Sequence, residues 1–201
     1  MRLNRYLASA GLGSRRACEA LVRDGVVTLN GEPCRKLATE VAEGDEVRVR
    51  GRPVRPSARL VIALNKPRGV LCTARDERGR RTIHDFLPPD IGRINSVGRL
   101  DMDSEGLIVL TNDGGLAEHL TRPANHVEKE YRVTLNREPS AEHLDKLLRG
   151  VFIPVEPRAA GRRPGRRKAR ALRVDWQRGY SLNVVLDQGI KRQIRLMFGA
   201  L

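Results

Sequence analysis

The sequence predicts an α+β protein built from a small N-terminal module and a larger mixed domain. Helical spacing of apolar residues dominates the first 24 residues, whereas short apolar strand runs alternate with helical segments from residue 60 onward. Between them, residues 51–58 hold two prolines and a glycine and show no apolar periodicity, which is typical of a linker. We therefore expect domains over residues 1–50 and 59–201, joined by residues 51–58.

The N-terminal module is predicted as two short helices on a small sheet. Apolar residues at helical spacing over residues 3–10 predict the first helix, and two glycines follow it. Ser14 is a suitable N-cap for a second helix that ends before Gly25. Residues 26–32 then predict a strand ending in an Asn-Gly hairpin turn, and residues 44–49 predict a closing strand.

The larger domain is predicted as a mixture of strands and helices. The expected strands lie at residues 60–64, 106–110, 131–135 and 182–186, and the expected helices at 115–120 and 141–149. One biased segment, residues 158–173, contains eight basic residues and no acid. A solvated loop is the first interpretation of this segment, and contact with RNA is the alternative.

The charge balance indicates a polyanionic partner. The net charge is +14 at pH 7, and basic residues occur in both halves of the chain. The alternative interpretation is a basic surface that serves solubility alone. Only seven aromatic residues are present, which argues against a nucleic-acid surface built from several stacking platforms. Recognition should therefore depend on phosphates and on shape.

Other function classes are disfavoured by composition. No apolar run approaches the roughly 20 residues that a membrane span needs, and the first residues lack the apolar stretch of a signal peptide. We therefore expect a cytoplasmic protein. The three cysteines are widely scattered, which fits neither a disulfide framework nor a zinc site and predicts reduced thiols.

Residues 98–114 are the most informative stretch. Three carboxylates, those of Asp101, Asp103 and Glu105, stand directly before an apolar strand, where a carboxylate costs several kcal/mol unless something holds it. Spacing alone favours a structural turn in which Asp101 caps backbone amides. A calcium loop is disfavoured because Asn112 stands where a bidentate Glu is needed. A magnesium site would need a phosphate-binding glycine-rich loop, and the sequence has none.

Several segments together carry a resemblance to a known family. Three of them are Asn65-Lys66-Pro67-Arg68-Gly69-Val70, Glu128-Lys129-Glu130-Tyr131-Arg132-Val133 and Gly189-Ile190-Lys191-Arg192-Gln193-Ile194-Arg195-Leu196-Met197-Phe198. Each alone is typical of a strand end, a core tyrosine or a basic helix. In order with Gly98-Arg99-Leu100-Asp101 and Thr111-Asn112-Asp113-Gly114, they resemble the pseudouridine synthases that modify small- and large-subunit ribosomal RNA.

The N-terminal module carries a second resemblance. Residues 3–8, 11–17 and 25–31 are similar to the S4 RNA-binding module over nearly its whole length. Its basic residues would form a cation face on the two helices, and an ordinary solvated surface is the alternative. The expected RNA-binding residues are Arg2, Arg5, Arg15, Arg16 and Arg23.

The family resemblance implies a site and a reaction. Asp101 is expected to be the catalytic aspartate, Arg195 its ion-pair partner, and Tyr131 the residue that stacks on the target base and takes up its C5 proton. Substrate-binding roles are implied for Lys66, Arg99, Arg192 and Ile194, with Lys66 and Arg99 either contacting the RNA backbone or supporting the loop. The resemblance implies a monomer that acts on ribosomal RNA or a ribosomal precursor particle, with no metal and no cofactor.

The chain departs from the family pattern in places outside the expected catalytic positions. Ile190 stands where relatives have Arg, and Ser104 where Thr is usual. Relatives also continue past the helix that carries Arg195, so we expect a largely antiparallel catalytic domain that lacks its C-terminal strands. A hypothesis from another class remains open at this point: a non-catalytic RNA-binding factor in ribosome assembly.

Overall fold

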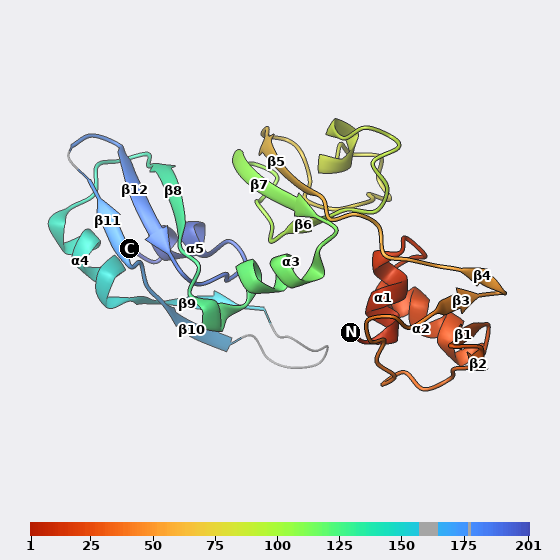
Figure 1. The fold of residues 1–201 in the computed structure, drawn as a ribbon. Coiled ribbons are helices and arrows are strands. Elements are labelled where there is room, and N and C mark those ends of the chain that lie inside the picture. The colour runs from red at the N-terminus through yellow and green to blue at the C-terminus, as the bar shows by residue number, and fades with distance from the viewer. Residues whose placement is uncertain (157–164, 177) are drawn as a thin grey trace. The chain divides into compact units, whose positions relative to one another are not determined.

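The structure is a computed structural model that describes residues 1–156, 165–176 and 178–201 (Figure 1). The chain forms two compact units, Met1–Ala117 and Glu118–Leu201, and each is described by itself. The boundary between the units lies inside the domain expected over residues 59–201. In the described part of the chain, no helix is long and apolar enough to cross a membrane.

The first unit begins with the expected helix pair. Helix α1 spans Leu3–Ser9 and α2 spans Arg15–Arg23, and the Ser14 hydroxyl accepts a hydrogen bond from the amide of Ala17. The strands that follow are β1 (Val27–Leu29), β2 (Glu32–Pro33), β3 (Val47–Val49) and β4 (Arg52–Pro53), which form an antiparallel sheet in the order β2-β1-β3-β4. The apolar sides of helices and sheet enclose one core: Leu3, Leu7, Cys18, Val22, Val27, Val41 and Val47.

Part of the segment expected as a linker, residues 51–58, belongs to the N-terminal sheet. Strand β4 pairs with β3, and Pro53 is tolerated there because β4 is an edge strand that needs no donor on its outer side. The Tyr6 hydroxyl donates to the carbonyl of Val54 at 3.2 Å, and the Ser57 amide donates to the carbonyl of Ser9 at 3.0 Å. These bonds hold the segment against helix α1.

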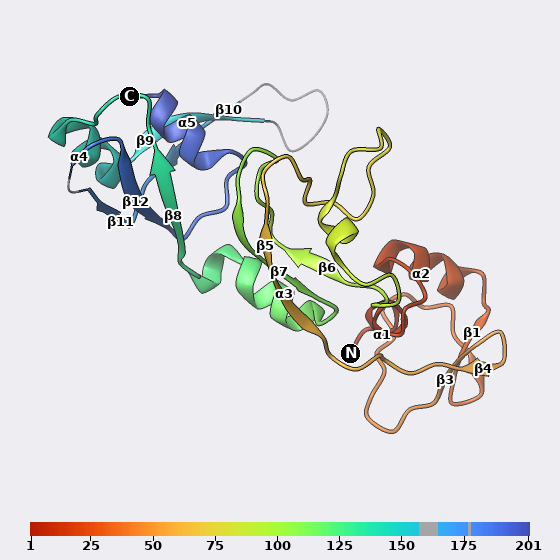
Figure 2. The same ribbon diagram turned by 90° about the horizontal axis from the view of Figure 1, so that it is seen from above.

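A second antiparallel sheet completes the first unit. Its strands are β5 (Val61–Lys66), β6 (Asn95–Val97) and β7 (Gly106–Thr111), in the order β5-β7-β6, as Figure 2 shows. A 3-10 helix, η1 (Ile83–Phe86), lies in the long connection between β5 and β6. The core of this part is formed by Val70, Ile83, Ile94, Ile108 and Leu110.

Residues Thr111 to Gly114 join the end of β7 to the start of β5 and begin the next helix. The Asn112 side chain accepts from the amide of Leu60 and donates to the carbonyl of Ala58, both at 2.8 Å. The Asp113 carboxylate accepts from the amide of Gly115 at 2.7 Å and so caps α3 (Gly114–Thr121). The family-like Thr-Asn-Asp-Gly element is therefore a structural joint.

In the residues that the structure describes, the second unit contains the end of α3, a three-stranded sheet, a strand hairpin, one 3-10 helix and two further α-helices. Its elements are η2 (Pro123–Asn125), β8 (Lys129–Thr134), α4 (Ala141–Arg149), β9 (Val151–Val155), β10 (Gly165–Ala169), β11 (Arg173–Asp175), β12 (Ser181–Leu186) and α5 (Gln193–Gly199). Strands β11-β12-β8 form one antiparallel sheet, and β9 pairs with β10. Their shared core is formed by Leu147, Ile153, Ala169, Ala171, Leu182, Val184, Leu186 and Met197.

The basic segment over residues 158–173, which was expected to be a solvated loop, forms strands over part of its described length. Residues 165–169 form strand β10 and Arg173 opens β11, so the loop interpretation is wrong for these residues. Buried Ala169, opposite Val151, fixes the strand, and its charged neighbours conceal that signal in the sequence. The expectation for residues 158–164 lies outside the described part of the chain.

Candidate active site

Asp101 lies in the loop between β6 and β7, and glycines stand at both ends of this loop. Gly98 has φ 74° and Gly106 has φ 123°, which are backbone conformations that side chains with a Cβ rarely adopt. Inside the loop, the amide of Ser104 donates to the main-chain oxygen of Asp101 at 3.0 Å and closes a turn. The Asp101 side chain is half-buried, whereas Asp103 and Glu105 are exposed.

The buried ammonium group of Lys66 is hydrogen-bonded to the main chain of this loop. The side chain is 0% exposed, and its Nζ donates to the carbonyls of Pro67 and Val70 at 2.9 Å and of Met102 at 3.4 Å. Burial lowers the pKa of Lys66, while the negative charges of Asp101, Asp103 and Glu105 act in the opposite direction. Of the two roles expected for Lys66, the geometry favours support of the loop, because no surface is left for RNA.

Three further contacts hold the same loop. The amide of Gly69 donates to the Met102 carbonyl at 2.8 Å, and Arg68 lies 3.4 Å from Glu105. The thiol of Cys72 accepts a hydrogen bond from the amide of Leu100 at 3.3 Å. Sequence reasoning treated Cys72 as an ordinary thiol, and no motif marks it as a contact of this loop. Arg99, the other expected RNA contact of the loop, is exposed.

Tyr131 and Ile194 belong to the second unit and pack against the same core. Tyr131 lies on β8 opposite Val184 of β12, and Ile194 lies on α5. Both side chains are half-buried against the cluster around Leu182 and Met197. One aromatic and one aliphatic side chain thus line a common apolar region.

The two cations expected on the last helix do not both lie on it. Arg195 is an exposed residue in the first turn of α5. Arg192 is instead the residue before the helix, with φ 56° in the left-handed region, and it is exposed. The expected pair of Asp101 with Arg195 draws one residue from each unit, and it stays a prediction.

Sequence reasoning missed two polar groups that fix the approach to α5. The buried amide of Gln193 accepts from the amide of Ile190 at 3.1 Å and donates to Gln188 at 3.3 Å. Nδ1 of His126, just before β8, lies 2.9 Å from the carboxylate of Asp187, which follows β12. Both groups brace the end of the sheet from which α5 departs. The Gln193 position belongs to the family-like motif, whereas the His126 and Asp187 pair carries no sequence signal.

The expected RNA-binding residues of the helix pair are mostly accessible. Arg2, Arg15, Arg16 and Arg23 are exposed. Arg5 is half-buried, and its guanidinium lies beside Gly115. The hydrogen bond from the Gly115 amide is the main cause that lowers the pKa of Asp113, and the charge of Arg5 acts in the same direction. Arg2, Arg15 and Arg16 are thus accessible to an anion, whereas Arg23 lies 3.8 Å from Glu19 and Arg5 lies beside the start of α3.

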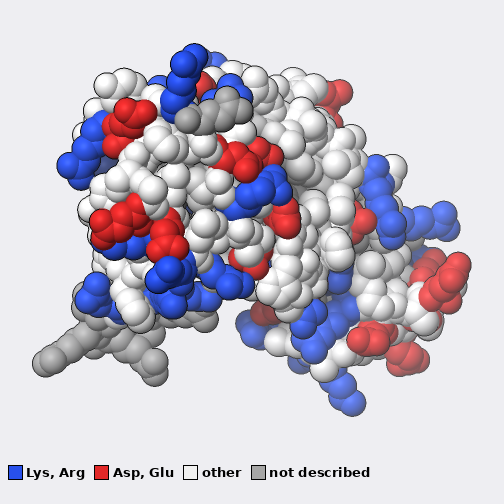
Figure 3. Space-filling model, turned by 90° about the vertical axis from the view of Figure 1, so that its left-hand side faces the viewer, with Lys and Arg blue, Asp and Glu red and all other residues white. Residues whose placement is uncertain are grey.

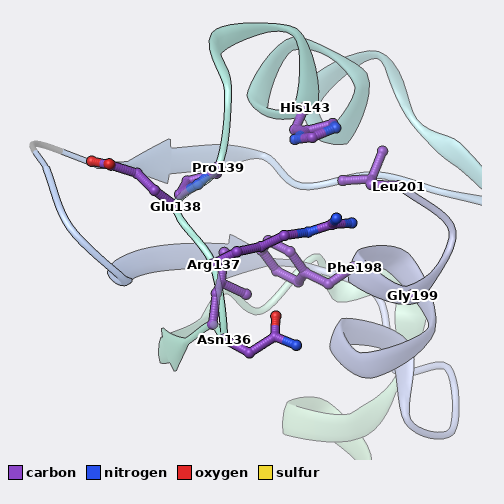
Figure 4. Close-up of a pocket in the computed structure, with 9 residues that line it drawn as sticks. Asn136, Arg137, Glu138, Pro139, His143, Phe198, Gly199 and Leu201 are labelled. Carbon is purple, nitrogen blue, oxygen red and sulfur yellow. The ribbon is translucent and has the colours of Figure 1, made fainter.

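A pocket of about 400 Å³ lies elsewhere in the second unit (Figure 4). Its lining includes Arg137, Glu138, His143, Phe198 and Leu201. None of the residues expected to act in catalysis or substrate binding lines this pocket. This pocket therefore adds no support for the expected site residues.

Sequence comparisons identify the class of both parts. The S4 domain matches residues 1–47, and the family described as RNA pseudouridylate synthase matches residues 60–200. The chain therefore belongs to the RNA pseudouridylate synthase family, with an S4 domain at its N-terminus. Both resemblances expected from the sequence are confirmed, and so is the α+β fold class.

Relatives place the chain more closely. It is 35% identical to ribosomal large subunit pseudouridine synthase B of Bacillus subtilis, over 100% of this chain and 80% of that protein. It is 37% identical to the protein of the same name from Vibrio cholerae, over 98% of this chain and 61% of that longer protein. A crystal structure of a pseudouridylate synthase matches with a TM-score of 0.63 and 26% identity, over 100% of this chain and 83% of that one.

Proposed function

We propose that this protein isomerises a specific uridine in ribosomal RNA to pseudouridine, with Asp101 as the catalytic carboxylate. Family membership and relatives named as ribosomal large subunit synthases support the reaction and the substrate class. The single structural observation that carries the role of Asp101 is its loop. That loop is fixed to buried Lys66 and to the turn at Gly69 through main-chain atoms.

The reaction exchanges one bond for another. The bond between N1 of the uracil and C1′ of the ribose breaks, the base turns, and C5 bonds to C1′. The proton of C5 is lost and N1 gains one, so the product is an isomer of the substrate. Asp101 would act either as a nucleophile on the sugar or as the base that removes the C2′ proton, and both roles require its ionised form.

The partner roles follow from what each route demands. Ionised Asp101 in a pocket that retains the detached base needs a cation, because burial alone raises a carboxyl pKa by several units and a nearby Arg lowers it by about 1 to 3. We assign this role to Arg195 at the start of α5. Tyr131 would stack on the base, and Ile194 would line the same pocket.

Anchoring of the loop contributes precision. A reacting group must stay within a narrow range of positions, and a displacement of about 1 Å can cost about 10²-fold in rate. The Lys66 ammonium group, the Gly69 amide and the Cys72 thiol bond to main-chain atoms of Leu100 and Met102, the two neighbours of Asp101 in the loop. We therefore expect the main chain on both sides of Asp101 to be held in place before RNA binds.

RNA binding would supply the remaining energy. A base must leave its stack to reach Asp101, at a cost of a few kcal/mol. Contacts between phosphates and exposed cations offset this cost, and the exposed arginines of the S4 domain, Arg15 and Arg16 among them, are suited to it.

The decisive experiment compares two carboxylates of one loop. Asp101→Asn should abolish pseudouridine formation on pre-ribosomal RNA while RNA affinity stays unchanged. Asp103→Asn is the matched control, because Asp103 is exposed in the same loop and the change in charge is identical. Pseudouridines are mapped by chemical labelling across ribosomal RNA, and affinity is measured by filter binding.

The alternative function predicts a different pattern. A non-catalytic assembly factor would bind the RNA and form no pseudouridine even as the wild type. Equal activity of wild type and Asp101→Asn would remove the catalytic role assigned to Asp101.

A further inference from the structure

The β9–β10 hairpin has one face directed to the core and one to the solvent. In its antiparallel register Lys168 lies opposite Phe152, and Arg166 lies opposite Pro154. Side chains alternate along a strand, so these four share a face, whereas Ile153 between them points the other way and is 0% exposed. Figures 1 and 2 show the two strands side by side.

The solvent face carries an aromatic ring that the core does not use. Phe152 is 57% exposed, and Pro154, Arg166 and Lys168 are exposed as well. The Arg166 guanidinium lies 5.9 Å from the centre of the Phe152 ring, and its Nη2 donates to the Phe152 carbonyl at 3.5 Å. Gly150 allows the Lys168 side chain to lie against the main chain, since a Cβ at position 150 would lie only 2.9 Å from Cε of Lys168.

The two cations of this face, Arg166 and Lys168, take part in no ion pair within the residues that the structure describes. Glu156, at the end of β9, pairs with Lys191 at 2.9 Å. Helix α4 of the same unit differs, because there Lys146 and Arg149 pair with acids one turn away.

We propose that the solvent face of the β9–β10 hairpin binds an unpaired segment of the RNA substrate. One base stacks on Phe152 beside the Arg166 guanidinium, and backbone phosphates contact Arg166 and Lys168. This inference rests on the proposed function, since it assigns to the hairpin a part of the same substrate. It also gives a defined place to the RNA contact that the basic segment suggested.

The chemistry of the face selects an unpaired strand. Bases in a duplex cover each other's faces, whereas unpaired bases stack on aromatic rings and on arginine planes. A double helix would meet the cations without using the ring. A protein partner would need a larger apolar area than one ring and one proline provide.

The test separates the ring from the charges. Phe152→Leu should weaken binding of a single-stranded oligouridine of about 12 nucleotides by about 5- to 100-fold, with an unchanged salt slope. Phe152→Tyr should bind like the wild type. Arg166→Gln with Lys168→Gln should lower the slope of log affinity against log salt by about 1.4. Affinities are measured by fluorescence anisotropy at several KCl concentrations.

The control variant carries the same change in charge elsewhere. Lys146→Gln with Arg149→Gln on α4 should leave the salt slope nearly unchanged. Equal losses in the control and the hairpin variant, or wild-type binding by Phe152→Leu, would overturn the proposal. An equal loss of affinity by Phe152→Leu for a fully paired RNA of the same length would also overturn it. The same holds if Phe152→Leu weakens binding only to vesicles of phosphatidylserine and phosphatidylcholine and not to the oligouridine.

Pseudouridine formation on ribosomal RNA, followed in the same variants, keeps the two proposals distinct. If wild type forms pseudouridine and Phe152→Leu retains both affinity and KM, the hairpin proposal fails and the proposed function stands. If wild type binds oligouridine through Phe152 but forms no pseudouridine on any ribosomal RNA, the catalytic function fails and the binding face stands.

Discussion

Lys66 places a positive charge entirely inside the first unit, where charged side chains are rarely found without partners. Its three acceptors are main-chain oxygens, and one of them, that of Met102, belongs to the loop of Asp101. The ammonium group therefore has a structural role in this part of the unit. It joins the end of β5, the turn at Gly69 and the candidate catalytic loop into one piece.

Lys66→Met should damage both stability and rate. Methionine fills a similar volume but donates no hydrogen bond, so buried carbonyls lose a donor and the free energy of unfolding should fall by about 1 to 3 kcal/mol. The loop should also shift, which lowers kcat by up to about 10²-fold at temperatures where the variant is folded. Urea unfolding and single-turnover pseudouridine formation measure the two effects.

Arg68→Gln is the matched control for Lys66→Met. Arg68 is an exposed cation of the same turn, and its removal should change the free energy of unfolding by no more than about 0.5 kcal/mol. A wild-type kcat in Lys66→Met would contradict the anchoring role.

At the scale of elements, α3 begins at a joint made of polar side chains. Asn112 ties the start of β5 to the end of β7, and Asp113 caps the helix with bonds to the amides of Gly115 and Leu116. The amide of Gly115 is the main cause that lowers the pKa of Asp113 from its usual 3.8. The charged carboxylate is thus favoured in the folded protein.

The pH dependence of this cap has a definite sign. Because the pKa is lower in the folded than in the unfolded protein, the contribution of Asp113 is complete above about pH 4 and is lost as pH falls through the folded value. Asp113→Ala should lower the free energy of unfolding by about 0.5 to 2 kcal/mol at pH 7, and the difference from wild type should shrink below pH 4. Urea unfolding from pH 7 to pH 3 measures it.

Asp113→Asn provides the comparison for that series, since asparagine also caps helices well but does not titrate. Its difference from Asp113→Ala should not depend on pH. A gap between wild type and Asp113→Ala that stays constant down to pH 3 would contradict the role of the charge.

Elements were predictable where local chemistry decides them. Ser14 caps α2 as expected, and the hairpin turn has Asn30 and Gly31 at φ 52° and 87°, which this residue pair favours. Strand β10 was not predictable, because three of its five residues are cationic and only pairing with β9 stabilises it. The residues of a strand do not by themselves indicate which distant strand will pair with it.

The candidate site also has features that the sequence predicts and features that it does not. The motifs predicted the loop before β7 as the position of the catalytic carboxylate, and this assignment stays a prediction. The burial of Lys66 was not predictable, since lysine is almost always exposed and one of its three acceptors, the Met102 carbonyl, lies 36 residues away in the sequence. The catalytic roles of Asp101, Tyr131 and Arg195 stay predictions, since none has been tested.

At the scale of the whole molecule, the excess of positive charge comes from basic residues in both halves of the chain. The net charge is +14, yet Figure 3 shows a face on which Lys and Arg side chains alternate with Asp and Glu side chains. Binding to RNA should therefore involve scattered phosphate contacts and not one uniform patch.

Salt should weaken this binding steeply. If about 6 phosphates are neutralised, raising monovalent salt from about 50 to 200 mM should lower the affinity for ribosomal RNA by about 10³-fold. Filter binding over a series of KCl concentrations gives the slope. A slope near zero would show that apolar contacts dominate and would contradict the electrostatic interpretation of the net charge.

The bonds to the Met102 carbonyl also bear on how the sequence can vary. Lys66 and Gly69 both recognise a main-chain oxygen, and the Met102 side chain is 40% exposed. Any residue compatible with the local backbone offers that same oxygen. Position 102, directly beside the candidate catalytic aspartate, is therefore free to diverge, and the loop can acquire new contacts to RNA without losing its support.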